Sequence, residues 1–371
     1  MRIAIDARKL HDFGIGTYIR NLVHQLAALD PASEYVLLAR PGDLAEATAA
    51  GANVRAVAES ARPYSLGEQL RLPLAARRLH ADLFHAPHYV LPPLVPGRTV
   101  VTIHDCIHLR FPRYLPSRAA WLYAHTMIRV AARKAACILT VSEASKRDIL
   151  HYTGVRPEKV VVVHNGIDAR FAAIPDDAAL ERVRLRFDLS HPFVLYVGNI
   201  KPHKNLERLI EAFAMARTAG PDDLRLVVIG DEVGKYPALR QMVHRHRLDK
   251  QVRFFGFQPA ATLVAFYRLA RAFVFPSLYE GFGLPPLEAM ANLTPVVTSN
   301  VSSLPEVVGD AALLVDPYDS ASIADGIRRV VVDEALRADL IARGRTRVQE
   351  FSWVRAASRT LDVYRDVAGR R

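Results

Sequence analysis

Residues 272–292 read Ala272-Phe-Val-Phe-Pro-Ser-Leu-Tyr-Glu280-Gly-Phe-Gly-Leu-Pro-Pro-Leu-Glu288-Ala-Met-Ala-Asn292. The first residues are an apolar run that predicts a buried strand, and a glycine-containing turn follows it. A helical pattern then begins near Pro285, where prolines suit the first turn of a helix. A strand, a glycine turn and a helix in this order direct free backbone N–H groups toward an anion. The stretch therefore predicts an α/β domain with an anion site at the start of one helix.

Two carboxylates flank this predicted anion site. Glu280 lies on the turn, and Glu288 lies about one turn inside the helix, where side chains tilt toward the N-terminus. Carboxylates accept hydrogen bonds from paired sugar hydroxyls. A nucleotide sugar carries its phosphates between two polyols, so both glutamates could contact one such ligand. The alternative is that Glu288 only complements the helix dipole and Glu280 is solvated.

The stretch resembles the E-x7-E motif of retaining GT-B glycosyltransferases of family GT4. Segments 295–298, 304–306 and 309–317 fit the same pattern, and the likeness covers most of the chain. The motifs at 14–18 (G-I-G-T-Y), 103–105 (I-H-D) and 204–205 (K-N) are most similar to those of bacterial mannosyltransferases of polysaccharide and O-antigen assembly. The resemblance implies that Glu280 contacts the donor hexose and that Glu288 contacts the nucleotide ribose.

Composition narrows the class of protein. The chain has 371 residues, enough for two domains of typical size. Its two cysteines, Cys106 and Cys137, form no CxxC pair, so we expect a reducing compartment rather than a disulfide framework. No long apolar segment precedes the strand-like residues 2–6, and no stretch approaches the ~20 apolar residues that span a bilayer. We therefore expect a cytoplasmic protein.

The net charge of +11 suits nucleic acid, an anionic membrane surface or a phosphate-bearing substrate. Nucleic acid is not expected, because no RNP, zinc-finger or Lys-rich tail pattern is present. Residues 110–134 combine arginines with aromatic residues and contain no acidic residue. This stretch is either a contact with the inner face of the cytoplasmic membrane or the solvated basic side of a helix packed on the sheet, and the sequence leaves both open.

Strand and helix patterns alternate along the chain, which predicts doubly wound, mostly parallel sheets. We expect strands at 2–6, 35–39, 53–57, 82–85, 99–103, 137–141, 159–163, 193–197, 225–229, 252–255, 272–275, 295–298 and 312–314. We expect helices at 17–29, 65–80, 117–134, 144–152, 205–217, 236–246, 260–268, 285–291 and 320–331.

The domain boundary is expected after residues 160–164, where Asn165-Gly166 is a turn dipeptide and a weakly periodic linker runs to about residue 190. The resemblance implies the GT-B fold: two Rossmann-like doubly wound domains that face each other across a ligand cleft. Residues 1–170 with a crossing helix at 353–371 would form the acceptor-binding domain. Residues 171–352 would form the domain that binds the nucleotide sugar.

Two loops of the first half carry candidate site residues. Gly14 and Gly16 open a helix directly after a strand, so their N–H groups could approach a phosphate. The third glycine of a dinucleotide fingerprint is absent because position 19 is Ile, which disfavours a Rossmann dehydrogenase. His104 and Asp105 end another strand, an edge where ligands of open α/β sheets bind. The resemblance implies that His104 lines the reaction centre.

A second constellation follows the strand at 193–197. Gly198 ends this strand and Lys204 opens the next helix, where an ammonium could neutralise a leaving diphosphate. Many relatives carry Arg at the positions of Asn199 and His203, so one phosphate contact is either missing or supplied by Lys201.

The resemblance further implies that the end of the strand at 252–255 contacts the nucleotide base. The expected catalytic residues are His104, Asp105, Lys204 and Glu280. The expected donor-binding residues are Gly14, Gly16, Gly198, Asn199, Lys204, Gly256, Phe257, Glu280, Gly281, Phe282, Gly283, Leu284 and Glu288.

The resemblance implies transfer of a hexose, with retention, from a nucleotide sugar to a hydroxyl of a saccharide or lipid-linked saccharide. It also implies GDP-mannose as the donor, and a UDP-hexose or a deoxysugar nucleotide is the alternative. No D-x-D pair is present, which fits a reaction without a metal, and we expect no cofactor. A GT-B sugar-nucleotide epimerase and a non-catalytic sugar-nucleotide-binding protein remain rival interpretations.

Overall fold

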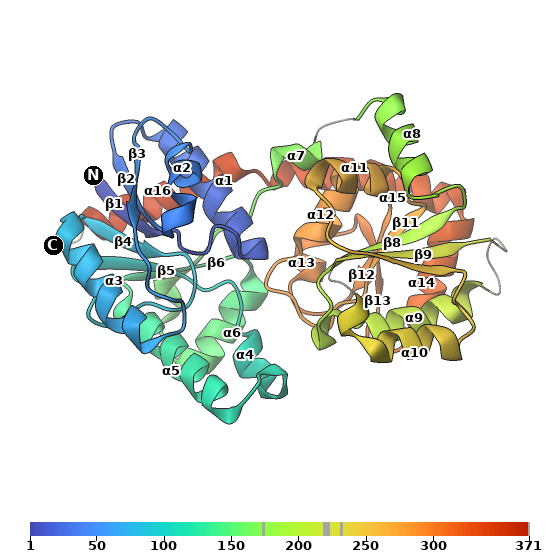
Figure 1. Ribbon diagram of the computed structural model, residues 1–371, viewed down its shortest axis with the longest axis horizontal. Helices are drawn as coiled ribbons and strands as arrows, with labels where there is room; N and C mark the ends of the chain where they lie inside the picture. The colour runs from blue at the N-terminus through green and yellow to red at the C-terminus, as the bar shows by residue number, and fades with distance from the viewer. Residues whose placement is uncertain (173–174, 218–222, 231–232, 370–371) are drawn as a thin grey trace. The chain divides into compact units, whose positions relative to one another are not determined.

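The computed structural model describes residues 1–172, 175–217, 223–230 and 233–369. The chain forms two units (Figure 1). Unit 1 comprises Met1–Gly166 and Ser352–Arg371, and unit 2 comprises Ile167–Phe351. The sequence placed the corresponding bounds at 170/171 and 352/353.

Unit 1 is built on a seven-stranded parallel sheet in the order β3-β2-β1-β4-β5-β6-β7. Its strands are β1 (Arg2–Asp6), β2 (Glu34–Ala39), β3 (Val54–Ala58), β4 (Leu83–Ala86), β5 (Arg98–Thr102), β6 (Cys137–Thr140) and β7 (Val160–Val162). Its helices are α1 (Phe13–Leu29), α2 (Leu44–Thr48), α3 (Leu66–Leu79), α4 (Ile107–Arg110), α5 (Arg118–Lys134), α6 (Glu143–Thr153) and α16 (Trp353–Gly369).

Helices cover both faces of this sheet, because successive strand residues point to opposite sides. Ile3 and Ile5 of β1 pack in one core cluster with α1 and α16, whereas Ala4 packs in another with α3, α5 and α6. The C-terminal helix α16 lies beside α1 (Figure 1). It therefore belongs to unit 1, as expected from the family resemblance.

Unit 2 is built on a six-stranded parallel sheet in the order β10-β9-β8-β11-β12-β13. Its strands are β8 (Phe193–Gly198), β9 (Arg225–Gly230), β10 (Val252–Phe255), β11 (Ala272–Phe275), β12 (Val296–Ser299) and β13 (Ala312–Val315). Its helices are α7 (Ala169–Ala172), α8 (Asp177–Arg186), α9 (Leu206–Ala216), α10 (Pro237–Arg245), α11 (Ala260–Leu269), α12 (Leu284–Ala291), α13 (Leu304–Val308), α14 (Ser320–Val332) and α15 (Glu334–Arg347). Both sheets are thus Rossmann-like, as the alternation of patterns predicts.

The structure corrects three sequence expectations. The segment expected to be a linker contains α8, in which no residue is buried, so it lacks an apolar period. Helix α15 was also not predicted, since it buries only Leu340 and Gly344. Helix α1 begins at Phe13, four residues before the expected start at 17. Among the described residues, no helix is long and apolar enough to cross a bilayer.

Candidate functional site

The turn between β11 and α12 has the geometry that the sequence predicts for an anion site. Gly283 caps α12 at a φ of +117°, and a Cβ there would lie 2.8 Å from Cδ2 of Leu304. Only glycine fits both the conformation and the close contact. Pro285 and Pro286 have no backbone N–H, so Leu284 is the one residue among the first three of α12 that can donate a backbone hydrogen bond. This donor and the positive end of the helix dipole are available to an anionic ligand.

Two serines fix the turn that carries Glu280. The Ser302 hydroxyl donates to the Glu280 carbonyl at 2.7 Å, and its oxygen accepts from the Glu280 N–H at 3.2 Å. The Ser303 hydroxyl lies 3.0 Å from the Glu280 carbonyl oxygen and 2.6 Å from that of Phe282. The two serine side chains come from outside the turn and hold its backbone through these hydrogen bonds. The backbone at Glu280 is therefore fixed, which limits the positions that the Glu280 carboxylate can take.

Lys204 and Glu280 form a mostly buried ion pair, with 2.6 Å between Nζ and Oε1 and 13% of each side chain exposed. Lys204 ends a 3-10 turn just before α9, and its Nζ also lies 5.2 Å from the centroid of the Phe275 ring. The next residue, Asn205, is buried at a φ of +63° and donates to the carbonyls of Pro276 (2.9 Å) and Pro317 (2.7 Å). These bonds tie the start of α9 to the segment after β11, which brings the two predicted catalytic residues of unit 2 together.

Glu288 lies in a less polar environment one turn further along α12. Its Oε2 accepts a hydrogen bond from the buried Tyr267 hydroxyl at 2.9 Å. Burial raises the pKa of Glu288 to about 7, with a further rise from Asp168, whereas Tyr267 and Arg170 oppose the shift. Arg170 is itself held by two hydrogen bonds to Asp168, at 2.9 and 2.7 Å. Near neutral pH, Glu288 can therefore exchange a proton when a ligand approaches.

The remaining predicted donor residues follow other strands of unit 2. Gly198 ends β8, where a Cβ would lie 2.9 Å from the Tyr196 hydroxyl oxygen, and Oδ1 of Asn199 is buried without a partner among the described residues. Gly256 and the exposed Phe257 follow β10, two strands from β8 in the sheet. All these residues lie at carboxyl ends of parallel strands, the edge where open α/β sheets bind ligands.

His203 and Lys201, which lie close together in the sequence before α9, have different surroundings in the fold. His203 is buried, and its carbonyl oxygen accepts from the Leu278 N–H at 2.7 Å and the Ser277 hydroxyl at 3.0 Å. Its backbone therefore supports the segment after β11. Lys201, in contrast, is exposed and can reach toward a phosphate through its flexible side chain.

In unit 1, His104 and Asp105 follow β5. Nε2 of His104 lies 2.9 Å from the carbonyl oxygen of Pro87, which can only accept, so Nε2 carries the proton. Burial lowers the pKa of His104, although Pro87 and Asp105 oppose this shift. The ring is therefore neutral, and Nδ1 is an acceptor. Oδ1 of Asp105 accepts from the Ile107 N–H at 2.9 Å and so holds the start of α4.

The Gly16 N–H, which the sequence suggested as a phosphate contact, is already bonded within the helix in this structure. Because α1 begins at Phe13, this N–H donates to the Asp12 carbonyl at 2.6 Å within the helix. Gly16 is instead required by packing, since a Cβ would lie 2.0 Å from the Leu10 carbonyl oxygen. Gly14 is exposed, has no atom within 4 Å of a Cβ position and lies in the first turn, where helix N–H groups lack intrahelical partners.

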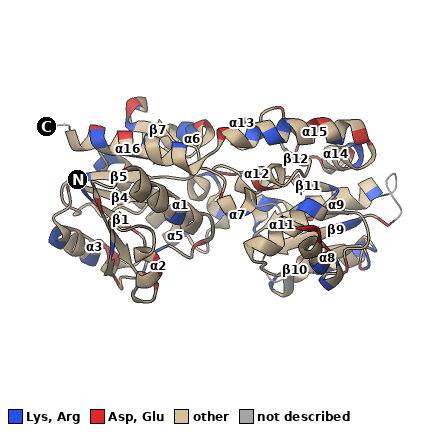
Figure 2. Cartoon of the chain, turned by 90° about the horizontal axis from the view of Figure 1, so that it is seen from above, with Lys and Arg blue, Asp and Glu red and all other residues tan. Residues whose placement is uncertain are grey.

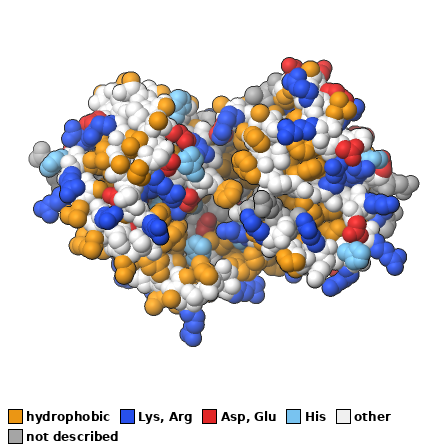
Figure 3. Space-filling view, in the orientation of Figure 1, with side chains coloured by type: hydrophobic (Ala, Val, Ile, Leu, Met, Phe, Trp, Pro, Cys, Tyr) orange, Lys and Arg blue, Asp and Glu red, His pale blue; other side chains and the backbone are white. Residues whose placement is uncertain are grey.

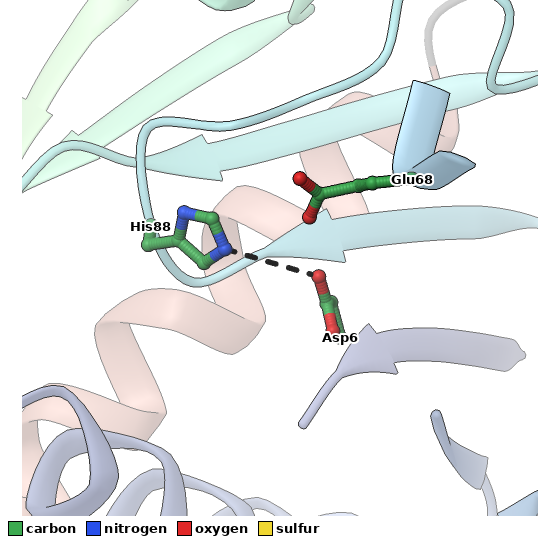
Figure 4. Close-up of side chains that lie close together, drawn as sticks. All are labelled: Asp6, Glu68 and His88. Carbon is green, nitrogen blue, oxygen red and sulfur yellow. Dashed lines mark ion pairs between the residues drawn. The ribbon is translucent and has the colours of Figure 1, made fainter. Parts of the chain in front are cut away.

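Sequence reasoning missed a buried charged cluster at the carboxyl end of β1. Asp6, Glu68 and His88 lie close together (Figure 4), and they are the single set of three possible metal ligands among the described residues. Arg8 already supplies a cation there: its guanidinium bonds Asp6 at 2.8 and 2.6 Å and Glu68 at 2.6 Å. The cluster is thus an internal ion-pair network. The only hint in the sequence was the pair of opposite charges Asp6 and Arg8 at the end of the first strand.

A second buried chain of hydrogen bonds lies under His104. The Tyr364 hydroxyl is 2.6 Å from Nδ1 of His85, whose Nε2 is 2.8 Å from Oγ1 of Thr102. The Tyr18 hydroxyl is 3.0 Å from the same Thr102 oxygen, and its ring meets the His104 ring edge-on with centroids 4.8 Å apart. Helix α16 therefore contributes to the position of the His104 ring.

Two family models match this chain. Residues 14–171 match "Glycosyltransferase Family 4", and residues 177–347 match "Glycosyl transferases group 1". The O-antigen chain mannosyltransferase B of Escherichia coli is 32% identical over 307 residues, which cover 81% of this chain and 79% of that protein.

Other relatives carry different names or lengths. The serotype-specific mannosyltransferase WbdA of Escherichia coli is 31% identical over 287 residues, but the match covers 34% of that protein, so this chain spans about a third of its length. The D-inositol 3-phosphate glycosyltransferase of Kineococcus radiotolerans is 31% identical over 86% of this chain and 82% of that protein.

Solved structures confirm the fold. The sucrose-phosphate synthase of Thermosynechococcus elongatus superposes with a TM-score of 0.81 at 22% identity and covers 99% of both chains. Two Rossmann-like units with a C-terminal helix in the first unit constitute the GT-B fold.

Proposed function

Because this chain belongs to the group 1 glycosyltransferases of family GT4, we propose that it transfers mannose from GDP-mannose, with retention and without a metal, to a hydroxyl of a saccharide or lipid-linked saccharide. The observation that carries this proposal is the Lys204–Glu280 ion pair, 2.6 Å long, beside the start of α12. It joins a cation suited to phosphate and a carboxylate suited to sugar hydroxyls at an anion-binding helix terminus.

Mannose is favoured by two of the relatives, both named mannosyltransferases at 31–32% identity. The inositol phosphate glycosyltransferase relative, at 31% identity, favours a second candidate: transfer of another hexose to a small polyol phosphate. The two candidates share the fold and the reaction type. They differ in the donor sugar and in the acceptor.

Binding of the donor diphosphate is proposed to redistribute the charges at α12. The Leu284 N–H and the Lys204 ammonium would contact the phosphates, which carry the negative charge that grows as the glycosidic bond to the sugar breaks. Lys204 would then leave Glu280, whose carboxylate becomes free to accept hydrogen bonds from the hexose hydroxyls. The protein thus exchanges one internal ion pair for two contacts to the donor.

Glu288 is proposed to accept hydrogen bonds from the ribose hydroxyls. These donors favour the ionised carboxylate, which burial disfavours in the free protein. Nucleotide binding should therefore lower the pKa of Glu288 from about 7 and release a proton at neutral pH.

In unit 1, the neutral His104 ring is proposed to accept a hydrogen bond at Nδ1 from a sugar or acceptor hydroxyl. The acceptor hydroxyl attacks the anomeric carbon on the face from which the diphosphate departs, and its proton passes to the departing phosphate oxygen. The new glycosidic bond then has the configuration of the bond that breaks. No covalent intermediate on the protein is involved in this proposal.

The test is incubation of the chain with a panel of sugar nucleotides, saccharide acceptors and lipid-linked acceptors, with and without EDTA. The proposal expects release of GDP and formation of an α-mannosylated product at rates that EDTA does not change. A modified sugar nucleotide without release of the nucleotide would identify an epimerase. Tight donor binding without any turnover would identify a binding protein, and either result would overturn the proposal.

A further inference from the structure

Helix α3 presents three leucines to solvent on one side. Leu66, Leu70 and Leu74 are 85%, 62% and 56% exposed. They recur every fourth residue, so they form one continuous ridge along the helix, here called the leucine ridge. The opposite side of α3 packs in the core of unit 1 through Leu72, Ala76 and Leu79. The leucine ridge is therefore not needed to attach α3 to the sheet.

The exposed charges of α3 are all positive. Arg71, Arg77 and Arg78 are exposed, and none of them takes part in an ion pair of the described chain. Glu68 is the one acidic residue of the helix, and it is buried against Arg8. Solvent-facing helical surfaces ordinarily combine both signs of charge with polar residues. The mixture of leucine and arginine on α3 is unlike such a surface.

The neighbouring helix α5 continues this surface. Helices α3 and α5 pack in the same core cluster, on the same face of the sheet, and the rings of Tyr64 and Tyr123 meet near their N-terminal ends with centroids 6.3 Å apart. Helix α5 exposes Arg118, Leu122 (58% exposed) and Arg133, and it contains no acidic residue. Orange and blue side chains lie over the α3 and α5 part of unit 1 in Figure 3.

Helix α15 of unit 2 shows what an ordinary solvated helix of this chain looks like. It carries both signs of charge (Figure 2), and its acids and arginines pair along the helix, as in Glu334–Arg337 and Asp339–Arg343. Helix α3 has no such pairs among its exposed residues. The contrast shows that the composition of α3 is not a general property of the basic chain.

We propose that the α3–α5 face, defined by the leucine ridge, Leu122 and the exposed arginines of both helices, docks on an anionic lipid bilayer. Leucines inserted at the headgroup boundary leave water, while arginine guanidinium groups stay at the level of the lipid phosphates. A surface of cations without acids is complementary to a negatively charged leaflet. Leucines that project singly from a convex helix need no matching pocket, which suits a fluid lipid surface better than a shaped partner.

This surface differs from the one that the sequence indicated. The basic stretch 110–134 contributes Arg118, Leu122 and Arg133 of α5, but three of the four exposed leucines of this face lie on α3. The proposal is also independent of the donor sugar, because docking requires neither nucleotide nor acceptor.

Flotation of the full chain with lipid vesicles tests the proposal. We expect binding to vesicles that contain phosphatidylglycerol and little binding to vesicles of phosphatidylcholine alone, with loss at high salt. The triple variant Leu66→Gln, Leu70→Gln, Leu74→Gln should bind at least about tenfold more weakly, because three apolar contacts with the lipid are lost. Glutamine keeps a helix propensity close to that of leucine, so α3 should remain folded.

The matched control is Leu185→Gln, Met215→Gln, Val332→Gln, which removes three exposed apolar side chains from unit 2. It should float like the wild-type chain, and circular dichroism melts should show all variants folded. A second variant, Arg71→Gln, Arg77→Gln, Arg78→Gln, should lose the preference for phosphatidylglycerol. The proposal is overturned if the wild-type chain does not float with the vesicles, or if the leucine variant floats equally well. It is also overturned if the wild-type chain binds no vesicles but self-associates, and the leucine variant loses that self-association.

Discussion

Replacement of Glu288 by Gln should stabilise the unliganded protein at pH 8 and weaken its binding of free nucleotide. The pKa of Glu288 is raised by burial from 4.5 to about 7. At pH 8 the folded protein therefore keeps a carboxylate ionised in an environment that disfavours the charge. Because one pKa unit corresponds to about 1.4 kcal/mol, the penalty is at most about 3 kcal/mol, and it is smaller to the extent that solvent still reaches the carboxylate.

The sign of the pH dependence follows from proton binding. Below the unfolded pKa of 4.5, the carboxyl is neutral in both states and the substitution gains nothing. Between 4.5 and about 7 the folded protein binds the additional proton, so the contribution of this group to stability falls as the pH rises. The stabilisation by Glu288→Gln should therefore stay below about 1 kcal/mol at pH 5 and reach its full size at pH 8.

Urea unfolding at pH 5 and pH 8 measures the stability change, and calorimetric titration of GDP measures the affinity. Affinity should fall about tenfold to a hundredfold, the range expected when a hydrogen-bonded charged acceptor is lost. Glu207→Gln on the exposed side of α9 is the control, and it should change neither quantity. The reasoning is refuted if Glu288→Gln has the same effect on stability at both pH values, or if nucleotide affinity is unchanged.

Three further outcomes are expected. Lys204→Ala should lower the transfer rate about a hundredfold to a thousandfold through lost stabilisation of the leaving diphosphate, and single-turnover kinetics that give a normal rate would contradict this. Gly16→Ala should destabilise unit 1 by about 1–3 kcal/mol, because its Cβ would lie 2.0 Å from the Leu10 carbonyl oxygen; Gly14→Ala, the control, should stay near wild type in thermal melts. Arg8→Met should cost about 3–5 kcal/mol in urea unfolding, since it leaves two buried carboxylates without their cation, and a wild-type midpoint would exclude that role.

The strands and the longer amphipathic helices could be predicted because apolar periodicity is local. The strand at 272–275 and the helix that follows it lie within a residue of their expected bounds. Helices α8 and α15 could not be found in this way, since their surfaces are almost entirely solvated and carry little apolar period. Helix α1 starts four residues earlier than expected, so the Gly16 N–H is bonded within the helix instead of being free in its first turn. No pattern in the sequence predicted this earlier start.

The parts of the site that depend on distant residues were beyond sequence reasoning. Glu280 and Lys204 were both predicted as site residues, but they are 76 positions apart in the sequence and their direct contact appears only in the fold. The hydrogen bond from the Tyr267 hydroxyl to Glu288 and the ion pair between Arg8 and Glu68 likewise join distant residues and appear only in the fold. On α3, leucines and alanines occur on both sides of the helix, so only the packing tells which set is core and which set is exposed.

The most direct test of the central claim, that Glu280 recognises the donor hexose beside a diphosphate held at α12, is a parallel measurement of GDP affinity and transfer rate in Glu280→Gln. Glutamine can still accept a hydrogen bond from Lys204 but has lost the charge, so the fold should be retained. We predict GDP affinity within about threefold of the wild-type value and a transfer rate reduced by about two orders of magnitude or more. Transfer near the wild-type rate, or loss of GDP binding in step with loss of transfer, would contradict the account.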